Sequence, residues 1–118
     1  MSMGGVSTRT RSYDLAAPGA NTNILGTAIT PREDGFFVVT VCLTTGSVFN
    51  VTTSDGTTTF TNGLNASAAL NAGDVYTFTF GVIASLGYNF QVETNSAIRM
   101  LIVHEVTDAA VINSAQGA

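Results

Sequence analysis

The chain has 118 residues, of which 45% are hydrophobic and only 10% are charged, and its formal net charge at pH 7 is -4. A soluble domain usually has about 25% charged residues, so Thr, Ser, Asn and Gly must supply most of the surface polarity. The acidic balance and the absence of lysine argue against nucleic-acid binding, which needs clustered basic residues. No apolar run approaches the roughly 18 residues of a membrane span. We expect no membrane partner, and synthesis in the cytoplasm without a signal peptide.

The N-terminal segment differs in charge from the remainder of the chain. Residues 1–12 contain Arg9 and Arg11 and no acid, whereas the remainder has two arginines and all eight acids. The segment shows no hydrophobic periodicity. We therefore predict an extended arm over residues 1–12, which becomes ordered on an acidic partner surface, and a single domain with a short C-terminal tail over residues 13–118.

Turn signals divide the first half of the chain into short strands. Pro18 and Gly19 mark a loop, and residues 31–35 form a charged turn, with a predicted strand over 24–30 between them. Residues 36–43 are apolar on both faces, which indicates a central strand covered on both sides. The strand at 48–54 leads through a hairpin signal at Asp55 and Gly56 into a strand at 57–62.

The second half of the chain alternates more regularly. A turn at 71–74 precedes residues 75–82, in which aromatic and Thr residues alternate as on a strand with one apolar face. Two further strands are predicted at 88–94 and 98–106, separated by a turn.

About eight strands and no helix predict an all-β fold, a two-sheet antiparallel sandwich. A jelly roll is favoured over an immunoglobulin-like domain, because the chain has no Trp and a single Cys. The alternation predicts a core that includes Phe37, Val39, Phe78, Phe80, Phe90 and Val92.

Candidate catalytic and metal-binding groups are scarce. His104 and Cys42 are the only residues of their types and lie on different predicted strands, so they cannot form a zinc site or a nucleophile–base pair within one chain. Asp34, Asp55 and Asp74 are interpreted as turn residues. A calcium site around Glu33 and Asp34 stays open but lacks a diagnostic spacing. We expect no catalytic residue, no metal ligand and no cofactor, and hence not an enzyme.

Residues 50–106 combine a Thr-rich hairpin, the segment LNAGDVYTFTF, a strand YNFQV and a closing aliphatic strand that ends in EV. In this combination the chain resembles small virion structural proteins of tailed bacterial viruses. Among such proteins, capsid decoration (cement) proteins are commonly jelly rolls or β-sandwiches that form trimers on the outer shell. The resemblance implies a structural protein on the capsid exterior, with the major capsid protein and further copies of itself, as a homotrimer, for partners. The predicted arm is similar in type, but not in residues, to the extended arms that such proteins lay across neighbouring capsid subunits. Because its charge is opposite to that of the body, we expect Arg9 and Arg11 to contact the capsid exterior.

A carbohydrate-binding or receptor-binding module, as in a tail or fibre component, is the alternative. Sugars stack on exposed aromatic rings, and jelly rolls include lectin domains. The absence of Trp and the position of most aromatic residues on the apolar side of strands weigh against it.

Overall fold

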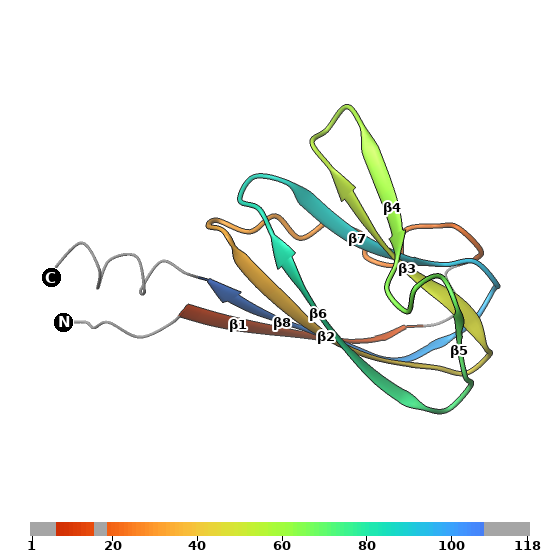
Figure 1. Cartoon of the computed structure of the whole chain (residues 1–118). Coiled ribbons are helices and arrows are strands. Elements are labelled where there is room, and N and C mark those ends of the chain that lie inside the picture. Colours follow the sequence, from red (N-terminus) through yellow and green to blue (C-terminus); the bar gives the residue numbers. More distant parts are fainter. Residues whose placement is uncertain (1–6, 16–18, 108–118) are drawn as a thin grey trace, which may run out of the picture.

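The computed structural model describes residues 7–15, through their backbone, and residues 19–107. Within these ranges the chain forms only β-strands and no helix (Figure 1), which confirms the predicted all-β class. The strands are β1 (Ser7–Leu15), β2 (Gly35–Leu43), β3 (Ser47–Ser54), β4 (Thr59–Gly63), β5 (Ala69–Leu70), β6 (Val75–Val82), β7 (Gly87–Val92) and β8 (Ile98–Thr107).

The strands form two antiparallel sheets that pack face to face (Figure 1). The first sheet has the order β1-β8-β2-β6. The second is built around β3, which pairs with β7 on one edge and with β4 and then β5 on the other. The predicted arrangement of two antiparallel sheets is therefore confirmed.

The outer edge of β7 is covered by the segment 21–29. The backbone N–H of Asn21 donates to the carbonyl of Val92 at 2.7 Å, and that of Ile24 donates to Phe90 at 2.8 Å. Ile29 and Tyr88 exchange two backbone hydrogen bonds of 2.8 Å as an isolated bridge. Residues 24–30, predicted as a strand, thus pair at separate points along β7 and form no continuous strand.

The hydrophobic core lies between the sheets. Phe37 of β2 contacts Tyr88 of β7 edge to face at a centroid distance of 5.3 Å, and Phe49 stacks on Phe90 at 5.6 Å. The residues predicted in the core divide by position. The predicted core residues on β2 and β7 are fully buried: Phe37, Val39, Phe90 and Val92. Phe78 and Phe80 on β6 are half-buried and pack against the core, because β6 is the last strand of its sheet.

The predicted N-terminal arm is corrected for residues 7–12. These residues belong to β1, which pairs with β8 from Ser7 opposite Thr107 onward, while residues 1–6 lie outside the described part. Apolar alternation in a sequence predicts strands that bury one face. It does not predict a strand that forms by pairing its backbone with the free edge of a neighbouring strand.

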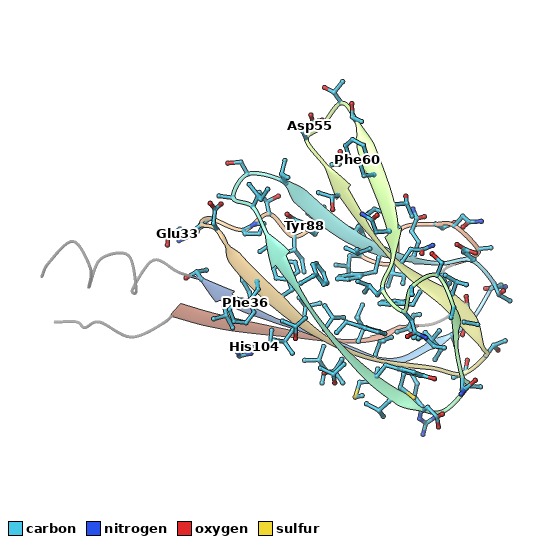
Figure 2. All side chains as sticks on the ribbon, viewed as in Figure 1. Glu33, Phe36, Asp55, Phe60, Tyr88 and His104 are labelled. Atoms are coloured by element: carbon cyan, nitrogen blue, oxygen red, sulfur yellow. The ribbon has the colours of Figure 1, made fainter. Side chains whose placement is uncertain are left out.

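The central position predicted for residues 36–43 agrees with β2, which lies between β8 and β6. Its coverage differs from the prediction, because the second sheet packs on one face only. Phe36 and Val38 on the other face are half-buried, and Phe36 points away from the second sheet (Figure 2).

Candidate functional site

The residues that could perform chemistry are not brought together. His104 pairs with Val38 and Cys42 pairs with Met100 in the β2–β8 ladder. Four residues of strand separate the two positions, about 13 Å at 3.3 Å per residue. Cys42 is also buried, with 5% of its surface exposed. Among the described residues, no group of three or more His, Cys, Asp or Glu side chains is arranged to hold a metal ion.

Three carboxylates, those of Asp34, Glu93 and Asp55, form structural hydrogen bonds in or beside turns. Asp34 accepts from the backbone N–H of Ala84 at 2.8 Å, which ties the turn before β2 to the loop after β6. Glu93 accepts from the side-chain amide of Asn50 at 3.1 Å. The hydrogen bond from Ala84 thus gives Asp34 an anchoring role between two loops.

Asp55 organises the turn between β3 and β4. Its Oδ1 accepts from the backbone N–H groups of Thr57 and Thr58, both at 2.8 Å. The hydrogen bonds from Thr58 and then Thr57 lower the pKa of Asp55 below its usual value of 3.8. Gly56 has a φ of +95°, a left-handed conformation that a residue with a side chain rarely adopts. The hairpin signal in the sequence therefore corresponds to this turn.

The β3–β4 hairpin projects beyond the rest of the sandwich, with Asp55 and Phe60 near its free end (Figure 2). The register places Phe60 opposite Thr53, on the side of the sheet that elsewhere faces the core. The ring is nevertheless 64% exposed. All residues from 55 to 62 are exposed, and Asp55 is the only charged one. The hairpin therefore presents a Thr-rich surface with one aromatic ring and a single charged residue.

The edge strand β6 forms a second exposed surface. Within the described chain β6 pairs only with β2, so its other edge is open. Tyr76, Phe78 and Phe80 are half-buried along one face, whereas Thr77 and Thr79 are exposed on the other. The sequence predicted the alternation but contains no signal that this strand ends its sheet.

The outer face of the first sheet is a third surface. It consists of alternate residues of β2, β6 and β8, and none of those described is Asp, Glu, Lys or Arg. Ile102 and Val106 are half-buried on this face, and His104 lies among them, pointing away from the second sheet as Phe36 does (Figure 2).

Arg9 and Arg11, the predicted capsid contacts, lie within strand β1. Their Cα atoms are opposite those of Glu105 and Val103 of β8. β1 therefore pairs with a strand, β8, that contains the buried residue Glu105, which is 3% exposed.

Comparisons with known proteins give no match: no protein-family model, no curated protein and no solved structure matches the chain. Within the described ranges there is no helix with the length and apolar character to cross a membrane. The site must therefore be interpreted from the described residues, which offer three surfaces with at most one charged residue each and no group of His, Cys, Asp or Glu side chains arranged to hold a metal ion.

Proposed function

We propose that the protein is a non-enzymatic structural component of a virus particle, which binds the outer surface of the capsid as a homo-oligomer and stabilises it. The observation that supports this best is the concentration of exposed apolar and hydroxyl side chains on surfaces with at most one charged residue each. Docking such surfaces requires little desolvation of charged groups, and charged residues are depleted at the centre of interfaces.

We also propose that the sandwich is a jelly roll. If the two-residue strand β5 is omitted and the segment 21–29 is included, the chain has eight pairing segments: β1, 21–29, β2, β3, β4, β6, β7 and β8. The first pairs with the eighth, the second with the seventh, the third with the sixth and the fourth with the fifth. This is one long hairpin rolled into two sheets, the arrangement found in viral capsid and lectin domains.

The β3–β4 hairpin is the proposed capsid contact. Arg9 and Arg11 belong to a paired strand, whereas most of the surface of Phe60 is exposed. Exposed aromatic residues are enriched at the energetic centres of interfaces, where they bury a large area. Phe60 takes the central role, with the surrounding Thr and Asn side chains as a polar rim.

Co-sedimentation with undecorated capsids of the virus that encodes the chain tests this function. The wild-type protein is expected to bind, and Phe60→Ser is expected to weaken binding at least tenfold. Ile83→Ser is the matched control, because Ile83 is 59% exposed on a different loop. Absence of wild-type binding would overturn the decoration function. Equal binding by Phe60→Ser and the wild type would contradict the proposed hairpin contact but not the decoration function.

A carbohydrate-binding or receptor-binding module is the second candidate. The exposed Phe60 shares its face of the hairpin with Asn62 on the same strand and with Thr53 opposite it, and these amide and hydroxyl groups suit a sugar that stacks and hydrogen-bonds. A glycan-array signal that disappears in Phe60→Ser would favour this function over capsid binding.

A further inference from the structure

The open edge of β6 is unusually regular for an edge strand. All eight residues, Val75–Val82, pair with β2 without a register shift. The pairing of β1 with β8 and that of β2 with β8 both contain a shift. The free side of β6 therefore presents an unbroken row of backbone groups.

Native proteins usually protect such edges with charged residues, Pro, bulges, short strands or a covering segment. The segment VYTFTFGV contains no charged residue and no Pro. The edge of β7, by comparison, is covered by the backbone of residues 21–29. Among residues 7–15 and 19–107, a covering segment lies along the edge of β7 and none lies along that of β6, which suggests that β6 has a partner outside its own chain.

We propose that this partner is β6 of a second copy, paired antiparallel about a two-fold axis at Phe78. The strand is self-complementary in this register. Phe78 lies opposite its own copy, Tyr76 lies opposite Phe80, and Thr77 lies opposite Thr79. A two-fold axis through a residue also keeps both faces aligned, so the first sheet becomes one eight-stranded sheet across the dimer.

The burial of the β6 aromatic residues fits this pairing. Tyr76, Phe78 and Phe80 point toward the core side but are only half-buried, and Tyr76 and Phe78 stack in parallel at a centroid distance of 6.2 Å. In the dimer each of these rings faces an aromatic ring across the axis. Cross-strand aromatic pairs are among the favourable pairs of antiparallel sheets.

The acid nearest to β6 in sequence does not oppose the dimer. This acid is Asp74, just before β6. With the axis at Phe78, the two copies of Asp74 lie at opposite ends of the paired strands, about 26 Å apart at 3.3 Å per residue. Salt screens exposed charges beyond about 8 Å at physiological ionic strength.

The size of the contact predicts a weak dimer. A strand edge about 26 Å long and about 10 Å deep buries on the order of 500 Å² in total, below the roughly 1,000 Å² of a stable interface. The dimer should therefore be populated at protein concentrations on the order of 100 µM. Binding to a capsid raises the effective concentration and would favour it further. The inference rests on the self-association in the proposed function and replaces the trimer implied by the resemblance with a dimer.

Disulfide trapping tests the register. Thr77→Cys and Thr79→Cys are prepared separately in a Cys42→Ser background, then oxidised alone and as a mixture. The mixture is expected to form cross-linked dimers at least fivefold faster than either variant alone, because residue 77 of one copy lies opposite residue 79 of the other. Equal rates in all three samples, or no cross-link, would overturn the register.

Sedimentation equilibrium tests the interface. The wild-type protein is expected to approach twice the monomer mass as its concentration rises. Thr77→Lys/Thr79→Lys, which adds facing charges at two exposed sites, is expected to raise the dissociation constant at least tenfold. Thr27→Lys/Thr30→Lys, which adds two charges at exposed sites in the segment before β2 and outside the β3–β4 hairpin, is the matched control and should behave as the wild type. A concentration-independent monomer, a trimer, or equal dissociation by both Lys variants would overturn the dimer. Capsid co-sedimentation of the Lys variants reports separately on the decoration function.

Discussion

The side-chain amide of Asn89 pairs with the backbone of Leu25 as a second peptide group would. Its Oδ1 accepts from the N–H of Leu25 and its Nδ2 donates to the carbonyl of Leu25, both at 2.9 Å. Asn89 is buried on β7, and Leu25 is buried in the segment that covers the edge of β7. One side chain thus satisfies two backbone groups that no regular ladder reaches, and it holds the segment 21–29 on the sandwich.

Asn89→Ala is expected to lower the free energy of unfolding by about 2–4 kcal/mol, because it leaves the buried N–H and C=O of Leu25 without their partner. Urea denaturation measures the loss. Gln91→Ala on the same strand is the control, since Gln91 hydrogen-bonds Asn23 at an exposed site. A loss for Asn89→Ala no larger than that of the control would contradict the structural role of this amide.

Truncation of core and edge aromatics should differ in cost. Phe37 is fully buried and contacts Phe80 and Tyr88, so Phe37→Ala is expected to cost about 3–5 kcal/mol of unfolding free energy. Phe78 is half-buried at the sheet edge, so Phe78→Ala should cost roughly half as much. Chemical denaturation of the monomer measures the unfolding free energy of both variants. Equal losses of unfolding free energy would mean that Phe78 is as buried as Phe37, and hence that the β6 edge is covered.

Removal of β1 tests the N-terminal strand. A chain that begins at residue 13 lacks most of β1 and leaves the edge of β8 without its backbone partners. We expect its melting temperature to fall by about 5 °C or more relative to a chain that begins at residue 7. Identical melting curves would restore the free arm that the sequence predicts.

The stability of the β3–β4 turn should depend on pH through the carboxyl group of Asp55. Its hydrogen bonds from Thr58 and Thr57 favour the ionised carboxyl, so its pKa lies below 3.8 in the folded protein. The stabilising contribution is complete above the unfolded value of about 3.9 and is lost as the pH falls through the lower folded value.

An NMR titration measures this pKa through the carboxyl carbon of Asp55 and the amide shifts of Thr57 and Thr58. All three signals should change together, with a midpoint below 3.8. Asp55→Asn should abolish the pH dependence of both amide shifts. Amide shifts that titrate unchanged in this variant would assign the effect to another group.

The strands with a buried face were predictable from the sequence. The alternation at 75–82 matches β6 to the residue, and the Asp55 and Gly56 signal identifies the β3–β4 turn, because both features depend on neighbours in the chain. Local periodicity reports which side of a strand meets the core.

Local periodicity could not predict which strand ends a sheet or how many faces of a strand are covered. Whether β6 ends its sheet depends on residues distant in sequence, and the apolar run of β2 is equally compatible with one covered face or two. The exposure of Phe60 has the same origin. Its position in an alternating hairpin predicts a core-side ring, but the hairpin projects beyond the body of the sandwich (Figure 1).

The pairing of Ser7 with Thr107 also affects how the chain folds. During synthesis β1 is made before the other described strands and its partner β8 after them, so β1 cannot pair until the chain has been made as far as β8. Contacts between such distant residues slow folding, since loop closure must precede any gain from pairing. β2 has no charged residue, and its edge that pairs with β8 then stays exposed until β8 is made, so nascent chains at high density would tend to aggregate.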